Sequence, residues 1–511
     1  MRAAGHSTLI KGGLVYDHDG DTDRPRTADI LIKGGLIDRV EPGLAERLRG
    51  AEAPGTVIDA RDRLVIPGFV NAHYHSHDVL FKGFFEPMPL YFWFVNALPP
   101  QYPKRSTEEV RARTLLGAAE CLHAGITTIQ DMLTISPFDD SHVDTVIKAY
   151  ADVGIRATLS LQIGDLKGLD RVPFWRESIP PEMHAYVGGA VEPSSGEGPV
   201  EWVARQYRRV SALPPRLRWG LSPTSAIMSS PELLSEIASL SDEAGLRVFT
   251  HIYETRSEAL GSRLFLAEHG GSQVKYLRSI GLLGPRLGLA HGVWMNGEEI
   301  EILAETGTSV ILNPASNMKT KGGVAPIRRY LASRVRLGLG CDNCSCTDIQ
   351  NMFQAMRLFA GLAAISDPEL GPPSAADAMR TATEGGAKAL GLDREIGAIK
   401  PGYKADLSLI DLSTFSFVPF NSAARQLVFS ETGRGVDTVL VDGEIVLDRR
   451  RLRTIDEDEL REAVGVVMHG LRHDHAAVRA RFEKLHPYLL AAWRRAWQDD
   501  IGLQQYVGRH P

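Results

Sequence analysis

The chain has 511 residues, of which 43% are hydrophobic, and a net charge of −6; this composition indicates an ordered globular protein. The mildly acidic charge, without a basic stripe, argues against nucleic acid as a partner. Four cysteines in so long a chain form no disulfide framework and favour a reducing cytoplasm. With no apolar signal region and no apolar stretch long enough to cross a bilayer, we expect a cytoplasmic enzyme without a membrane partner.

Short β-strands are predicted near both ends of the chain. These strands are β-branched runs, several of them broken by glycine pairs, at residues 7–16, 28–40, 405–411 and 436–446. Two strand-rich ends around a different middle predict a small β-sandwich domain that both ends build together. We place this composite domain at residues 1–66 and 395–450.

The middle of the chain alternates short apolar strands with helical patterns such as residues 106–123 and 231–244. The strands are expected at residues 64–75, 125–130, 155–161, 217–222, 246–251, 287–291, 309–313 and 335–342. Alternating β and α units predict parallel strands, and eight of them predict a (β/α)₈ TIM barrel. We place the barrel at residues 67–394, followed by a helical C-terminal extension at residues 451–511.

A metal-binding signal lies in the first barrel strand. The segment PGFVNAHYH ends in His73 and His75, which are separated by one residue. Because side chains of a strand alternate with a period of two, both imidazoles project to the same side. Imidazole pairs of this kind are ligands of divalent transition metals. The alternative interpretation is a pair of hydrogen-bonded core histidines.

Other polar residues end later strands of the predicted barrel. His251 ends the fifth strand, His291 the sixth and Asp342 the eighth. In such barrels the C-terminal strand ends form the active-site face. We therefore expect His73, His75, His251 and Asp342 to bind one divalent metal ion and to leave a coordination position open for water, as catalytic sites do.

The residues around this site predict hydrolysis. A metal lowers the pKa of a bound water from about 15.7 toward about 7, so hydroxide exists at neutral pH. Glu254, three residues after His251, can protonate a ring nitrogen or leaving group during attack on the adjacent carbon. Asp342 can take the proton of the water, and His291 can hold the hydroxide or stabilise the tetrahedral centre. The alternative for Glu254 is a solvated loop glutamate, and the alternative for His291 is a histidine that only packs against a helix.

With these residues in order, the chain resembles the amidohydrolase superfamily, in its cytosine-deaminase-like branch of aminohydrolases and triazine chlorohydrolases. The matching motifs are PGFVNAHYH, HIYETRSE, LAHGVWMNGEEI, TGTSVILNPASNMK and IGAIKPGYKADLSLID. The resemblance implies one ion, zinc or alternatively iron, on His73, His75, His251 and Asp342, with Glu254 as the catalytic acid. It also implies a homodimer or homotetramer.

The chain departs from that branch at the fourth and eighth strands. It reads GLSPTS where many relatives carry a polar or histidine-bearing stretch, and CDNC where relatives often carry Thr-Asp-Gly. These changes do not affect the four predicted metal ligands, but they leave the identity of the substrate undetermined. No lysine lies in residues 217–224, whereas dinuclear relatives bridge their two metals with a lysine of the fourth strand, so one metal is expected.

Five residues near the predicted site are candidate substrate contacts: His77, Phe84, Trp93, Ser222 and Asn313. The aromatic run that contains Phe84 and Trp93 is interpreted as an apolar wall over a planar substrate, with simple loop packing as the alternative. For His77 a plain surface position is the alternative, and for Asn313 it is turn capping.

Three cysteines flank Asp342 in the sequence: Cys341, Cys344 and Cys346. A thiolate site is one interpretation of this cluster. Small buried hydrophobic residues near a strand end are the favoured interpretation.

The predicted function is a metal-dependent hydrolase of carbon–nitrogen bonds other than peptide bonds. Hydroxide attacks an sp² carbon of a nitrogen-containing, heterocyclic small molecule, and ammonia or an amine leaves. The alternative is another leaving group on the same residues, as in a chlorohydrolase or in the hydrolysis of an arylurea, amide or carbamate. A remote alternative is a non-catalytic scaffold.

Overall fold

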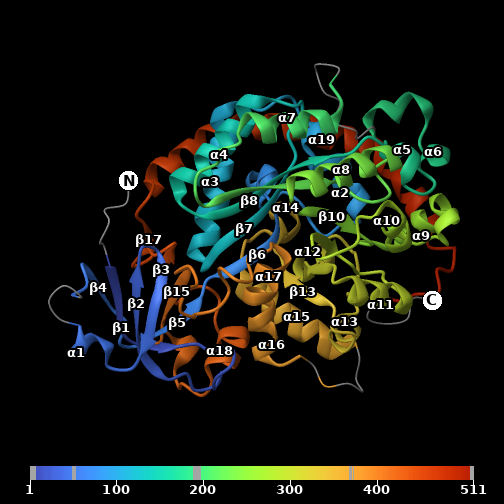
Figure 1. The fold of residues 1–511 in the computed structure, drawn as a ribbon. Coiled ribbons are helices and arrows are strands. Elements are labelled where there is room, and N and C mark those ends of the chain that lie inside the picture. Colours follow the sequence, from blue (N-terminus) through green and yellow to red (C-terminus); the bar gives the residue numbers. More distant parts are fainter. Residues whose placement is uncertain (1–6, 49–52, 188–196, 367–370, 372, 507–511) are drawn as a thin grey trace.

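The computed structural model describes residues 7–48, 53–187, 197–366, 371 and 373–506 (Figure 1). Its strands form two nine-stranded sheets. One sheet is built from both ends of the chain, and the other curls into a barrel with helices around it.

The first sheet joins the two ends of the chain, which lie side by side as blue and orange-red strands in Figure 1. The path of the sheet is β18-β17-β16-β15-β5-β1-β2-β3, and β4 also pairs with β1. Its strands are β1 (Ser7–Val15), β2 (Thr27–Lys33), β3 (Leu36–Glu41), β4 (Thr56–Asp59), β5 (Arg63–Pro67), β15 (Leu407–Asp411), β16 (Val436–Val441), β17 (Glu444–Asp448) and β18 (Arg451–Leu452). The prediction of a small β domain built by both ends is confirmed.

The second sheet is the predicted barrel, with parallel strands in the order β13-β12-β11-β10-β9-β8-β7-β6-β14. Its strands are β6 (Phe69–His75), β7 (Ile126–Leu133), β8 (Arg156–Ile163), β9 (Leu217–Pro223), β10 (Val248–Ile252), β11 (Leu287–His291), β12 (Ser309–Leu312), β13 (Arg336–Leu339) and β14 (Asp342–Asn343). The eighth barrel strand is interrupted. Its first part, β13, pairs with β12, and its second part, β14, pairs with β6, where Asp342 is opposite Tyr74. This interrupted strand closes the barrel.

The predicted first strand, residues 64–75, is wrong in its extent because the chain changes sheets at Gly68. Residues before Gly68 form β5, which pairs with β1 and β15, whereas residues after it form β6, which pairs with β7 and β14. A Cβ atom at Gly68 would lie 2.2 Å from Thr127 Oγ1. Only glycine fits this close passage between the sheets, and an apolar run alone does not reveal it.

The helices cover the barrel and connect its strands. They are α1 (Leu44–Arg47), α2 (Leu90–Ala97), α3 (Thr107–His123), α4 (Asp140–Val153), α5 (Gly168–Arg171), α6 (Trp175–Ser178), α7 (Pro199–Arg209), α8 (Pro231–Ala244), α9 (Arg256–Phe265), α10 (Gln273–Ile280), α11 (Gly297–Thr306), α12 (Pro314–Lys319), α13 (Ile327–Ala332), α14 (Cys344–Thr347), α15 (Met352–Ser366), α16 (Ala375–Arg380), α17 (Gly386–Ala389), α18 (Ala423–Phe429) and α19 (Glu457–Ala496). The predicted helices at 106–123 and 231–244 correspond to α3 and α8.

The helical extension is α19, which packs against α3, α2 and α6 (Figure 1). Its apolar stripe includes Leu485 and Leu489, both without exposed surface. Near its end the guanidinium of Arg495 lies 4.0 Å from the ring centroid of Phe174, in the loop before α6. Across the described part of the chain, no helix has the length and apolar character of a membrane span. We propose three domains with the predicted limits. They are the composite β domain at residues 1–66 and 395–450, the barrel at residues 67–394 and the helical extension at residues 451–511.

A buried ion cluster joins the barrel to the β domain. Arg156, at the start of β8, donates hydrogen bonds to Asp406 at 2.8 and 2.9 Å and to Asp442 at 2.9 Å. The side chain of Arg156 is 3% exposed and that of Asp406 is 1% exposed. Removal of the Arg156 cation would take the ion pair from the buried carboxylate of Asp406, which is a costly arrangement. Asp442 would keep its longer contacts to Arg216 at 3.7 Å and Lys404 at 3.9 Å.

We predict that Arg156→Met lowers the unfolding free energy by about 3–5 kcal/mol, seen as a lower midpoint in urea denaturation. Arg61→Met is the matched control, because Arg61 and its partner Asp59 are exposed and exposed pairs contribute little. Equal midpoints for the two variants would contradict a structural role of the buried cluster.

Candidate metal centre

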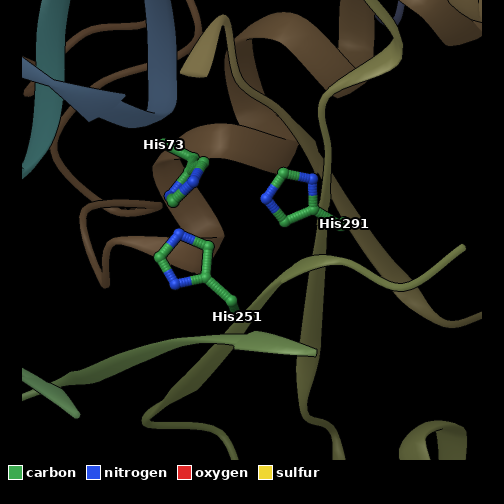
Figure 2. A group of neighbouring side chains, drawn as sticks. All are labelled: His73, His251 and His291. Carbon is green, nitrogen blue, oxygen red and sulfur yellow. The ribbon is translucent and has the colours of Figure 1, made fainter. Parts of the chain in front are cut away.

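Four histidines and two carboxylates meet at the C-terminal ends of the barrel strands. His73 and His75 come from β6, His251 from β10, and His291 from the end of β11. In Figure 2 the rings of His73, His251 and His291 point toward one another. Their ligand atoms all lie within 4.8 Å of one another. The barrel therefore brings together side chains that are about two hundred residues apart.

Asp342 lies between the two histidines of β6. Its Oδ1 is 3.3 Å from the Nε2 atoms of both His73 and His75. The Nε2 atom of His75 is in turn 3.4 Å from that of His251. The four residues of the predicted ligand set thus turn their donor atoms to one small volume.

Backbone carbonyls orient two of the imidazoles. His75 Nδ1 donates to the carbonyl of Met132 at 2.6 Å, and His251 Nδ1 donates to that of Thr224 at 2.6 Å. A proton held on Nδ1 leaves the lone pair on Nε2 directed at the centre. This arrangement is typical of metal-bound histidines.

The unsatisfied atoms of the cluster fit a cation. Within the described residues, His73 Nε2 and Asp342 Oδ1 are buried and have no hydrogen-bond partner, although they lie 3.3 Å apart. Buried polar atoms are nearly always satisfied. Three imidazole nitrogens and one carboxylate oxygen are the donors that a divalent transition metal prefers, so a metal would satisfy them together.

Burial and charge set the protonation states of this cluster. Burial lowers the pKa of His73 to about 4 and lowers the pKa of His251 further below its usual value, so both rings are neutral at pH 7. Burial acts to raise the pKa of Asp342, but the adjacent imidazoles of His73, His75 and His291 outweigh burial and hold that pKa low. Burial acts to lower the pKa of His75, but the neighbouring Asp342 outweighs burial and raises that pKa. The cluster therefore offers an ionised carboxylate at Asp342 and neutral imidazoles at His73 and His251, the forms that bind metal.

The pKa of Glu254 is shifted in the opposite direction to that of Asp342. Burial raises its pKa, and the charges of Asp342 and Glu258 raise it further. Its Oε2 lies 3.5 Å from His291 Nε2, while His291 Nδ1 contacts the Asn317 Oδ1 at 2.8 Å. The site thus holds two carboxylates whose pKa values are shifted in opposite directions, a pattern typical of acid–base catalysis.

Glu258 supports the loop that carries Glu254. Its carboxylate accepts hydrogen bonds from the backbone N–H groups of Tyr253 at 3.0 Å and Glu254 at 2.8 Å, and from the side chain of Gln273 at 3.1 Å. Tyr253 adopts a positive φ of 50°. His291 and Asp342 also have positive φ values, 74° and 64°; strained backbone of this kind gathers at functional sites.

A pocket opens onto the metal cluster, with a free volume of about 580 Å³ including its mouth, within the range of small-molecule sites. Its described lining residues are His75, His77, Leu90, Tyr91, Trp93, Phe94, Leu98, Gln162, Thr224, Ser225, Met228, His251, Glu254, Glu258, Asp342, Asn343 and Cys346. Helix α2 supplies four of these residues, and Tyr91, Trp93 and Phe94 among them form an aromatic wall.

Two of the five candidate substrate contacts line this pocket. His77 is buried; its Nδ1 accepts a hydrogen bond from the backbone N–H of Thr134 at 3.3 Å, and its Nε2 lies 3.3 Å from the Asn343 side chain. Trp93 donates its indole N–H to Ser345 Oγ at 2.7 Å, which holds the ring in the pocket wall.

The other three candidates lie elsewhere. Phe84 packs on His475 of α19, with ring centroids 4.6 Å apart. Ser222 donates to Ser160 Oγ at 2.6 Å inside the barrel, and Asn313 lies buried at the end of β12. None of them is among the described lining residues of the pocket. The aromatic run of the sequence is divided between two places, because Trp93 lies in α2 and lines the pocket, whereas Phe84 precedes α2 and packs on α19.

The three cysteines beside Asp342 are buried free thiols. Burial raises the pKa of Cys341 to about 12 and raises those of Cys344 and Cys346 well above their usual value. All three are therefore neutral at pH 7, in keeping with the interpretation as small buried hydrophobic residues. Cys346 also contributes to the pocket wall.

Several lining residues were missed from the sequence. Gln162 and Thr224 end the third and fourth barrel strands, so the rule that strand ends form the site could have indicated them. Leu98 and Met228 carry no local signal of a pocket. They are brought to it by the packing of α2 against the loop after β9.

A parallel barrel with a buried histidine–aspartate cluster at its C-terminal face defines a barrel metallohydrolase. The sequence profile of the amidohydrolase family matches residues 64–446, more than half of the chain. The chain belongs to the amidohydrolase family.

Relatives with known activities are similar over most of the chain. A 5-methylthioadenosine/S-adenosylhomocysteine deaminase of Thermococcus kodakarensis is 34% identical over 86% of this chain and 94% of that protein. A 5'-deoxyadenosine deaminase of Methanothermobacter thermautotrophicus is 32% identical over 91% of this chain and 99% of that protein.

Solved structures share the fold. An adenosine deaminase from Xanthomonas campestris with bound zinc has a TM-score of 0.79 and 26% identity over 92% of this chain and 99% of that chain. Atrazine chlorohydrolase from Arthrobacter aurescens, complexed with zinc, has a TM-score of 0.77 and 24% identity over 90% and 99%, a likeness of fold alone. Family and relatives together identify a metal-dependent hydrolase that acts on carbon–nitrogen bonds of a small molecule.

Gly340 makes room for the metal cluster. A Cβ atom there would lie 2.3 Å from Asn313 Oδ1 and 2.8 Å from His73 Cβ. We predict that Gly340→Ala displaces His73 and weakens metal binding about 10- to 100-fold, as changes beside metal ligands do. Competition with a chelator, followed by metal analysis, measures the affinity.

Gly361→Ala in α15 is the matched control, because a Cβ atom at Gly361 meets nothing within 4 Å. If both variants hold metal equally tightly, Gly340 has no part in shaping the site.

Proposed function

We propose that this protein is a mononuclear zinc-dependent deaminase that removes the exocyclic amino group of an adenine-type ring in a small molecule. The observation that carries the proposal is the pair of carboxylates beside the unsatisfied imidazoles: Asp342 with a lowered pKa and Glu254 with a raised one. Such a pair can accept one proton and donate another within one pocket.

His73, His75, His251 and Asp342 would hold the ion. Their donor atoms lie close together, and those of His73 and Asp342 lack other partners in the described structure. His291 is assigned outside the ligand set because its Nε2 faces Glu254 Oε2 at 3.5 Å and Asp342 Oδ2 at 3.8 Å. The bound ion supplies Lewis acidity, which makes a water nucleophilic near neutral pH.

The side chains of the pocket then divide the proton transfers among themselves. Asp342 accepts a proton from the attacking water as its oxygen bonds to the ring carbon that carries the amino group. Glu254 donates its proton to the adjacent ring nitrogen. His291, within 4 Å of both carboxylates, stabilises the charge of the tetrahedral carbon. The proton on Asp342 then passes to the amino group and the C–N bond breaks. The remaining hydroxyl proton returns to Glu254, and ammonia leaves behind an oxo-substituted ring.

Two observations support an adenine-type ring. The wall formed by Tyr91, Trp93 and Phe94 suits the face of a planar heterocycle. The relatives that cover most of the chain are named as deaminases of 5'-modified adenosines, which favours deamination over the alternative leaving groups. The complete ligand set and the buried acid favour an enzyme over a scaffold.

Zinc is proposed as the ion because zinc is bound in two structures that share the fold and suits a histidine–carboxylate site. A homodimeric or homotetrameric state and a cytoplasmic location stay predictions.

An ammonia-release assay tests the function. We expect the zinc-loaded protein to release ammonia from adenosine, 5'-deoxyadenosine or 5'-methylthioadenosine, with the matching inosine product seen by mass spectrometry, and the chelated protein to release none. Chloride from a chlorotriazine or an aniline from an arylurea, without ammonia from the adenosines, would refute the proposal.

The role of Glu254 is tested by Glu254→Gln. We expect full metal content and turnover lower by about a hundredfold or more, because the amide cannot donate the acidic proton. Glu301→Gln is the matched control, since Glu301 is exposed on α11. Turnover of Glu254→Gln equal to that of the control would remove Glu254 from the mechanism.

A further inference from the structure

A second chamber adjoins the metal pocket. Its described lining residues are Phe94, Val95, Leu98, Pro100, Gln101, Thr134, Gln162, Ile163, Gly164, Leu166, Gly168, Trp175, Val187, Thr224 and Met228. Five of these residues also line the metal pocket, so the two spaces are continuous. The chamber has a free volume of about 730 Å³ including its mouth.

The described lining of this chamber carries no charged side chain. Its polar groups near the junction satisfy one another: Thr134 Oγ1 donates to Gln162 Oε1 at 3.1 Å, and Gln162 Nε2 donates to Thr224 Oγ1 at 2.7 Å. Beyond this row the wall is mostly apolar. A charged group that entered the chamber would lose water without gaining an ionic partner, which is unfavourable.

The walls of the chamber are held in place by the C-terminal helix. Val95 of α2 and Trp175 of α6 belong to one buried apolar cluster with Leu485 and Leu489 of α19. Val95 is 2% exposed and Trp175 is 3% exposed. The chamber is therefore a preformed part of the fold, and a ligand need not order these walls on binding.

We propose that the apolar chamber binds an uncharged, apolar substituent of the substrate, attached to the portion whose ring lies at the metal. This inference rests on the proposed function, since it places a tail beyond a ring that is deaminated. The tail passes the Gln162–Thr224 row and lies against Leu166 and Trp175. The protein thereby selects neutral, apolar-tailed substrates over those that end in a carboxylate or an amino acid.

Specificity constants for a series of 5'-thioether adenosines test the proposal. The series compares methyl, propyl and pentyl tails with carboxylate-terminated tails of equal length. We expect kcat/KM to rise about fourfold for each buried methylene until the chamber is filled. We expect kcat/KM for each carboxylate-terminated compound to be at least tenfold lower than kcat/KM for the neutral compound of equal length. A flat series, or a preference for the carboxylates, would overturn the chamber assignment while leaving the deaminase function in place.

A charge introduced at the wall gives the reciprocal test. Leu166 is only partly buried, so Leu166→Arg is compatible with folding. We expect this variant to raise kcat/KM for carboxylate-terminated tails, relative to neutral tails of equal length, at least tenfold above the ratio of the original protein. Leu264→Arg places the same charge on an exposed position of α9 and should keep the original preference. If both variants keep the original preference for neutral tails, Leu166 does not face the tail and the proposal is wrong.

Calorimetric binding of the same compounds to zinc-loaded Glu254→Gln separates failure of the chamber from failure of the function. Affinity that rises with alkyl length, without turnover of any compound by the original protein, would uphold the chamber as a binding site and refute deamination. Absence of both binding and turnover across the series would overturn both.

Discussion

The structure depends on one electrostatic requirement: imidazole nitrogens and a carboxylate oxygen, buried together without partners, need a cation between them. His73 Nε2 and Asp342 Oδ1 lie 3.3 Å apart and make no hydrogen bond in the described structure. Burial holds the pKa of His73 at about 4, so the ring does not supply the missing positive charge itself. A divalent ion would supply it, and the same ion would provide the Lewis acidity of the proposed reaction.

The barrel meets this requirement through constraints that reach beyond the donor atoms. Carbonyls of Met132 and Thr224 orient two rings, Gly340 leaves space for His73, and Asp342 takes a left-handed backbone conformation where the last strand is interrupted. Each of these features costs local stability or conformational freedom. The parallel ladder continues on both sides of the interruption, because β13 pairs with β12 and β14 pairs with β6.

The space around the ion has two parts with different chemistry. The metal pocket combines an aromatic wall with titratable groups, whereas the neighbouring chamber is mostly apolar and carries no charge among its described residues. Helix α19 supports both, because its apolar stripe packs on α2 and on Trp175. The C-terminal extension thus helps to shape both spaces through packing.

The sequence by itself determined the barrel, the β domain built by both ends, and the convergence of His73, His75, His251 and Asp342, because strand periodicity and the order of strand ends are local signals. Tertiary structure alone decided the break at Gly68 and the departure of Phe84 to α19. It also created the second chamber from α2, α6 and the ends of β8 and β9. These features arise from contacts between segments distant in sequence, and such contacts leave no periodic pattern in any one segment.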